Sequence, residues 1–168
     1  MNATETTQTN VFDGFNPESK VWIYSSNRLL TVDETATINQ QLLEFTKQWT
    51  SHNNALKAAG TVLHNRFIVL SADDSIENPG GCSIDKSIHF IQGIETHYGL
   101  SLFDRLTIYY QSDNEMKSFH FSDLQNKIAS GEISENTLII DTTITQLRAL
   151  QSEFVKEAGQ SWLARFIK

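Results

Sequence analysis

The clearest change from strand to helix lies in residues 66–85, RFIVLSADDSIENPGGCSID. The apolar run at 67–70 predicts a buried strand, and the paired glycines after an acidic turn predict a break before the next element. Beyond Ile84, apolar residues recur at helical spacing as far as Tyr98. The segment therefore predicts a strand, a loop and a helix, with the only cysteine, Cys82, at the start of that helix.

Similar patterns extend in both directions along the chain. Residues 21–24 predict a strand, and the spacing of Ile38, Leu42, Phe45 and Trp49 predicts one face of a helix. Two strands follow if Asn65 separates residues 61–64 from 66–71. Later elements are predicted as a β-hairpin at 106–121, a short helix ending at 129, a strand at 137–140 and a long helix from 143 or 145 to 162.

This order predicts a single α+β domain over residues 20–168, in which helices cover a mixed β-sheet. Its first part, β-α-β-β-α-β, corresponds to a ferredoxin-like unit if residues 61–71 form two strands. Residues 1–19 are rich in threonine and asparagine and predict a flexible N-terminal arm, with Phe12 and Phe15 as candidate anchors.

The amino-acid composition limits the classes of partner that this protein can bind. The net charge of -7 argues against nucleic acid and against an anionic membrane surface, because both bind through excess lysine and arginine. The polar residues 1–10 are not typical of a signal peptide, and no apolar run reaches the ~20 residues that span a bilayer. One cysteine can form neither an internal disulfide nor a thiolate-rich zinc site. We therefore expect a soluble, cytoplasmic protein.

Sequence motifs for cofactors are missing. No glycine precedes a lysine, so the phosphate-binding loop of P-loop ATPases is absent, and GxGxxG is absent as well. The histidines have no pairwise spacing typical of metal ligands. They are His52, His64, His89, His97 and His120. We predict no metal, no cofactor and no nucleotide hydrolysis.

Cys82 has two interpretations. It is either a small buried residue at a helix cap, or a reactive thiol at a helix N-terminus that uses His52 or His64 as a base. Acidic neighbours disfavour a thiolate and favour the buried cap, for which slow reaction with thiol reagents is expected. These neighbours are Asp73, Asp74, Glu77 and Asp85.

The glycine turn also predicts an anion site. Free backbone N–H groups at a helix N-terminus favour anions, and arginines brought close to them would add charge. The alternative for Arg105 is an ion pair with Asp104 at the entry to a strand. The candidate ligand-binding residues are Gly80, Gly81, Ser83, Arg66 and Arg105, with Arg28 as a further arginine.

Four segments carry a resemblance to a known family. They are VWIY at 21–24, RFIVL at 66–70, GCSIDKS at 81–87 and LFDR at 102–105. Together they resemble a family of short uncharacterised proteins from Bacteroidetes, over roughly residues 20–165. Members are often described as ABC transporter ATPases, a description that the missing phosphate loop does not support here. The resemblance implies a cytoplasmic bacterial domain and supplies no activity.

Two functions follow from these observations. The first is a cytoplasmic binding or interaction module, monomeric or a small homo-oligomer, which binds a small anion or a partner protein at the Gly80 turn. The second is a cysteine-dependent enzyme or thiol sensor centred on Cys82. A base within ~3.5 Å of the sulfur would distinguish them, because activation of the thiol needs hydrogen-bond reach.

Overall fold

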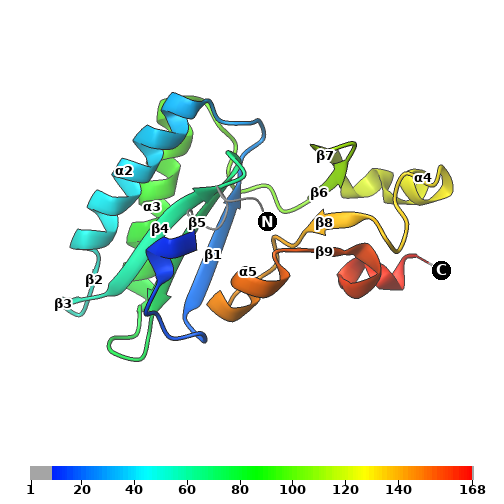
Figure 1. The fold of residues 1–168 in the computed structure, drawn as a ribbon. Coiled ribbons are helices and arrows are strands. Elements are labelled where there is room, and N and C mark those ends of the chain that lie inside the picture. The colour runs from blue at the N-terminus through cyan, green and yellow to red at the C-terminus, as the bar shows by residue number, and fades with distance from the viewer. Residues whose placement is uncertain (1–8, 168) are drawn as a thin grey trace. The chain divides into compact units, whose positions relative to one another are not determined.

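The computed structural model describes residues 9–167 and confirms the α+β class. Within the domain predicted for residues 20–168, it distinguishes two compact units. The first consists of the described residues up to Phe103 together with Ile144–Gln151, and the second of Asp104–Thr143 and the described residues from Ser152 onward (Figure 1). No helix among residues 9–167 is both long and apolar enough to cross a membrane.

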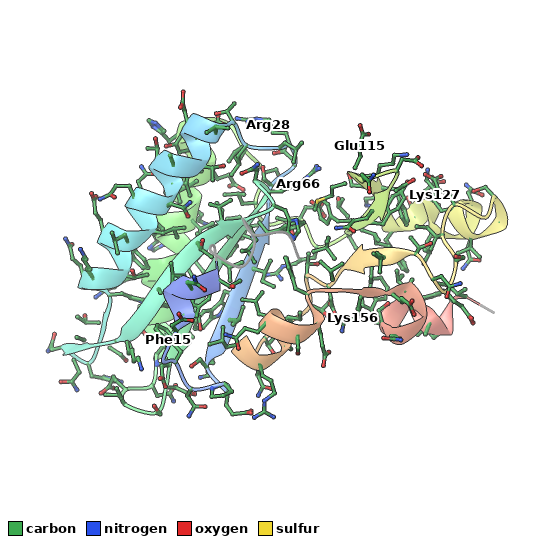
Figure 2. The ribbon with its side chains drawn as sticks, in the orientation of Figure 1. Phe15, Arg28, Arg66, Glu115, Lys127 and Lys156 are labelled. Atoms are coloured by element: carbon green, nitrogen blue, oxygen red, sulfur yellow. The ribbon has the colours of Figure 1, made fainter. Side chains whose placement is uncertain are left out.

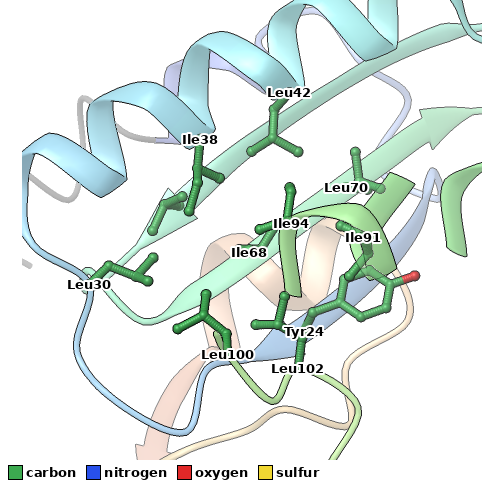
Figure 3. Close-up of a cluster of buried hydrophobic side chains, with 11 residues drawn as sticks. Tyr24, Leu30, Ile38, Leu42, Ile68, Leu70, Ile91, Ile94, Leu100 and Leu102 are labelled. Atoms are coloured by element: carbon green, nitrogen blue, oxygen red, sulfur yellow. The ribbon is translucent and has the colours of Figure 1, made fainter. Parts of the chain in front are cut away.

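The first unit is built on a three-stranded antiparallel sheet of order β1-β5-β4. Helices α2 and α3 pack on the same face of this sheet, as Figures 1 and 3 show. A two-stranded hairpin of β2 and β3 follows α2, and the 3-10 turn η1 precedes β1. The bounds are η1 Asn10–Phe12, β1 Lys20–Ser25, α2 Val32–Gln48, β2 Thr50–Ser51, β3 Asn54–Ala55, β4 Lys57–Leu63, β5 Phe67–Asp73 and α3 Gly81–Tyr98.

The ferredoxin-like order is confirmed only through α3. Residues 57–63 and 67–73 do form two antiparallel strands, as the order requires. The next strand, at 107–112, does not join this sheet but pairs within the second unit. Beside β1 the chain instead places a short segment, in which Thr145 O accepts from Val21 N at 2.9 Å and Leu147 N donates to Ser19 O at 2.9 Å.

Local signals explain the two helices. Thr31 and Glu34 form a capping box at the start of α2, with each side chain accepting from the other residue's backbone N–H. Helix α3 ends at Gly99, whose φ of 63° is costly for other residues. Their buried faces meet the sheet in one cluster, shown in Figure 3. It contains Tyr24, Leu30, Ile38, Leu42, Val62, Ile68, Leu70, Ile91, Ile94, Leu100 and Leu102.

Part of the predicted N-terminal arm is packed. Phe12 is buried, its ring contacts Phe15, and Asn16 N donates to the carboxylate of Asp73 at 3.0 Å. The expectation of a flexible arm is therefore wrong for residues 9–19, because apolar burial and hydrogen bonds hold them against β4 and β5. The rest of the predicted arm, residues 1–8, lies outside the described residues.

The second unit has a four-stranded antiparallel sheet of order β7-β6-β8-β9. All described strand pairs of the chain are antiparallel, so the predicted mixed sheet is wrong. The predicted hairpin is confirmed, and Asp113 and Asn114 turn with positive φ between its strands. The bounds are β6 Thr107–Ser112, β7 Glu115–His120, η2 Phe121–Asp123, α4 Leu124–Ala129, β8 Leu138–Ile140, β9 Val155–Glu157, η3 Ala158–Gln160 and η4 Trp162–Arg165.

The prediction of a long terminal helix is also wrong. Helix α5 covers only Leu147–Glu153 and is followed by β9 and two 3-10 turns. Gly159 lies directly against Glu135, where an added Cβ would be 3.1 Å from the Glu135 Cβ and 3.2 Å from its backbone oxygen. A long-range contact therefore overrides the helical spacing of this segment.

Candidate functional site

Apart from Arg105, which belongs to the second unit, the candidate residues lie at two ends of the first unit. His64 and Arg66 belong to the turn before β5, whereas Gly80 and Cys82 follow the other end of that strand. Seven residues of strand separate these ends by roughly 20 Å at ~3.3 Å per residue. Neither His64 nor Arg66 can therefore act on the same small ligand or atom as Cys82.

The two arginines near the β4–β5 turn, Arg28 and Arg66 (Figure 2), are bound to other groups of the chain. The buried Arg66 donates from Nε to the Ser26 carbonyl oxygen at 3.0 Å. Arg28 forms an ion pair with Glu34 at 2.8 Å and donates to the carbonyl oxygen of Tyr98, at the C-terminal end of α3. The predicted anion site combined Arg105 with Arg66 and Arg28 at the Gly80 turn, and of these Arg66 and Arg28 are not part of such a site.

The Gly80 turn is instead held by the β2–β3 hairpin. Ser51 Oγ donates to the Asn78 carbonyl oxygen at 2.9 Å and accepts from Gly80 N at 3.2 Å. His52 is the one candidate histidine brought to this end, and its Nε2 is 3.5 Å from the position that a Cβ at Gly80 would take. The sequence does not indicate these contacts, because nothing in the local pattern links the hairpin to residue 80.

Ser83 is part of the structure of the turn. Its side chain is buried, its Oγ donates to the Gly80 carbonyl oxygen at 2.7 Å, and its own carbonyl oxygen accepts from Trp49 Nε1 at 2.8 Å. These bonds fix the first turn of α3 against the end of α2. Ser83 is consequently not available to bind a ligand, while Gly81 is exposed.

Cys82 is exposed, so the predicted burial is wrong. The buried face of α3 starts one residue later, at Ser83, and continues through Ser87 and Ile91. One residue turns a helix by about 100°, which rotates Cys82 out of the interior. Within the described part of the chain, its thiol has no hydrogen-bond partner and no three His, Cys, Asp or Glu residues cluster as metal ligands.

Exposure predicts fast labelling of the native thiol. We expect Cys82 to react with a chromogenic disulfide at pH 8 within about tenfold of the rate in the urea-unfolded chain, since access no longer limits the reaction. Absorbance of the released thiolate measures both rates, and Cys82→Ser is the blank. A native rate a hundredfold slower would contradict the exposed position.

A groove of about 1100 Å³ lies along β4, also within the first unit. Strand β4 is an edge of its sheet and forms the floor, with α2 on one side and the N-terminal segment on the other. We call it the β4 groove. It is lined by residues 56–61, by Ala36, Asn39, Gln40, Leu43, Thr46 and Lys47, and by Val11 and Phe15.

The outer backbone edge of β4 faces this groove. Val62 N donates to Asn39 Oδ1 at 3.0 Å instead of to β5, so the N–H and C=O groups of Val62 point outward. Because backbone groups alternate along a strand, those of Gly60 and Ala58 point outward as well. No strand among residues 9–167 pairs with them.

Gly60 brings helix α2 close to this edge. A Cβ at residue 60 would lie 3.0 Å from the Cδ2 atoms of both Leu42 and Leu70, and 3.1 Å from the Val69 backbone oxygen. Any larger residue would push α2 away from β4. Glycine thus fixes the distance between the helix and the floor of the groove.

Each side wall of the groove carries an exposed apolar residue, and the charges of its described lining residues are positive. Val11 is 45% exposed and Leu43 is 47% exposed, one on each side of β4. Lys47 and Lys57 line the groove, and none of the described residues that line it is acidic. Lys57 Nζ lies 2.7 Å from the Gly14 carbonyl oxygen and 3.4 Å from Asp73 Oδ2, whereas Lys47 has no partner among the described residues.

Asp73 holds the N-terminal wall in place. Its nearly buried carboxylate accepts from Asn16 N, from Ser75 N and from Ser75 Oγ, and pairs with Lys57. Burial by itself raises the pKa of Asp73, but the hydrogen bonds from Ser75 and Asn16 prevail and lower it to about 2, from 3.8. The charged form is therefore the one that the fold stabilises.

This carboxylate predicts a loss of stability in acid. Because the pKa of Asp73 is lower in the folded than in the unfolded chain, its contribution is complete only above about pH 5 and is lost as the pH falls through 3.8 to about 2. We expect on the order of 2 kcal/mol, measured as the difference in urea unfolding free energy between pH 5 and pH 2.5 for wild type and Asp73→Asn. Equal pH dependence in both proteins would contradict the assignment.

Comparison with family models, with curated proteins and with solved structures found no match. The resemblance to the Bacteroidetes family stays a prediction. The β4 groove combines an open backbone edge, an exposed apolar residue on each side and positive charge.

Proposed function

We propose that this chain is a cytoplasmic binding module, and that it takes up an extended segment of a partner protein in the β4 groove. The observation that carries the proposal is the position of the groove, which runs along a sheet edge whose outward backbone groups at Ala58 and Gly60 are unpaired by any described strand. Such an edge accepts an added strand through main-chain hydrogen bonds.

The size of the groove supports a peptide. A volume of about 1100 Å³ lies at or above the upper end of ordinary small-molecule pockets. Residues 57–61 of the floor extend for roughly 15 Å at ~3.3 Å per residue, which matches about five residues of an added strand. In an added strand, alternate side chains would face Leu43 on one side and Val11 on the other.

The charges indicate an acidic partner segment. Lys47 and Lys57 line the groove, and no acidic residue lines it within residues 9–167, on a chain whose net charge is -7. Carboxylates of a partner would meet Lys47, whose ammonium group is unpaired in the described structure. A second copy that pairs through the same edge is disfavoured as the occupant, because β4, Lys57–Leu63, carries no acidic side chain to meet Lys47.

The thiol alternative has weaker support. Cys82 is accessible, and His52 lies at the same end of the unit, but no hydrogen bond joins a base to the sulfur among the described residues. Without a base in reach, the thiol is not activated by this geometry.

A defined peptide tests the proposal. The probe is a fluorescein-labelled octapeptide, capped at both ends, in which valines alternate with threonine and glutamate. We expect saturable binding to the full chain by fluorescence anisotropy, with a Kd on the order of 100 µM or lower. The same peptide with lysine in place of glutamate should bind at least ~10-fold more weakly, about 1.4 kcal/mol.

Two results would overturn the proposal. One is the absence of saturable binding by the acidic probe up to millimolar protein. The other is a concentration-dependent dimer in sedimentation that the probe does not dissociate, which would assign the edge to a second copy of the chain.

A further inference from the structure

The second unit contains a separate pocket of about 220 Å³, lined only by residues of that unit. Ile108 and Ile139, both buried strand residues, form part of its wall. Phe121 and Trp162 form an aromatic side, with ring centroids 6.0 Å apart. Among the residues that the structure describes, Arg105 is the only charged one that lines the pocket. Apolar walls with a single charge are typical of small-ligand sites.

Arg105 differs from the other arginines of the chain. It is the one arginine for which the described structure gives no hydrogen bond, ion pair or ring contact. The other four each have a partner: Arg28 pairs with Glu34, Arg66 donates to Ser26, Arg148 pairs with Glu18, and Arg165 lies over the Phe166 ring. Arg66 and Arg165 each have a partner that is not a carboxylate, whereas the exposed guanidinium of Arg105 has no partner in the described structure.

The carboxylate of Asp104, the residue before Arg105, accepts hydrogen bonds from the residues that follow it. Asp104 accepts from Leu106 N at 2.7 Å and from Thr107 Oγ1 at 2.5 Å. The hydrogen bond from Thr107, followed by that from Leu106, lowers the pKa of Asp104. The predicted ion pair of Asp104 with Arg105 is therefore wrong. The Asp104 carboxylate instead accepts hydrogen bonds from Leu106 and Thr107 at the start of β6.

We propose that this pocket binds a small monocarboxylate with an aryl or branched alkyl body. The carboxylate would pair with the guanidinium of Arg105, whose planar donors suit two carboxylate oxygens. The body would contact Phe121, Trp162 and the isoleucine wall. Thr142 adds a hydroxyl to the lining, and no hydrogen bond of its side chain is present in the described structure. This site is independent of the β4 groove, and neither proposal depends on the other.

Phenylacetate is the probe. In a ¹H–¹⁵N spectrum of the full chain, we expect the indole N–H signal of Trp162, assigned with Trp162→Phe, to shift saturably with a Kd on the order of 1 mM. Trp22 and Trp49 belong to the first unit, and their indole signals should stay unchanged. Phenylacetamide, which has the same body without the charge, should bind at least ~10-fold more weakly.

Arginine variants complete the experiment. Arg105→Gln should weaken phenylacetate binding at least ~10-fold while the rest of the spectrum keeps its folded dispersion. Arg165→Gln is the matched control, since it removes a surface arginine of the same unit outside the pocket lining, and it should leave the Kd unchanged. The proposal is overturned if phenylacetamide binds as well as phenylacetate, if Arg105→Gln keeps its affinity, or if Trp162 does not shift.

Discussion

Replacing Trp49 by alanine should destabilise the first unit by about 3–5 kcal/mol, the range for removing a buried tryptophan. Trp49 is 2% exposed and packs against the rings of Phe45 and Trp22, at 5.3 and 5.8 Å between centroids. Its indole N–H also donates to the Ser83 carbonyl oxygen. The alanine variant loses the packing and the bond that joins the end of α2 to the start of α3.

Chemical denaturation measures this loss, with Trp49→Phe as the matched variant. Phenylalanine keeps most of the apolar volume and removes the donor, so we expect a smaller loss of about 1–2 kcal/mol. If both variants were within ~0.5 kcal/mol of wild type, Trp49 would not join the two helices as described.

Replacing Leu43 by aspartate should abolish binding of the acidic octapeptide, with a loss of at least ~50-fold in affinity, about 2.3 kcal/mol. The change removes an apolar wall residue and places a negative charge beside Lys47, where the probe's glutamates are expected. Leu43 is 47% exposed, so the fold should tolerate the change. Fluorescence anisotropy measures the affinity and thermal unfolding checks the fold.

Val32→Asp provides the control on the same helix. Val32 is 80% exposed at the first residue of α2 and does not line the groove. It introduces the same charge, at a helix N-terminus that tolerates aspartate. Unchanged binding by Leu43→Asp, or equal losses in both variants, would show that the peptide binds elsewhere or responds only to net charge.

Most of the secondary structure could be predicted because its signals are local. The apolar run before β5, the spacing on α2 and the Gly99 stop of α3 each indicate an element within a few residues. Hairpin β6–β7 was predicted in the same way, from turn residues between two β-rich runs. The prediction of a long terminal helix is wrong because Gly159 packs against Glu135. Helical periodicity cannot reveal such a long-range contact.

The sites were less predictable because they depend on distant residues. The sequence favours a buried Cys82, yet the buried face of α3 begins at Ser83, which turns Cys82 outward. The β4 groove is formed because Val11 and Leu43 lie on opposite sides of one strand. Only the tertiary fold brings these two residues to the same groove. The small residues at 58–60 are a weak sequence signal for the groove, because small side chains in a strand allow another segment to approach its backbone closely.

Hydrogen exchange at two backbone amides tests strand addition in the β4 groove most directly. With the acidic octapeptide at saturation, the amide protons of Ala58 and Gly60 should exchange at least ~10-fold more slowly, because they donate to the peptide. Val62 should change little, since its N–H already donates to Asn39. Unchanged exchange at Ala58 and Gly60 while the peptide is bound would contradict strand addition.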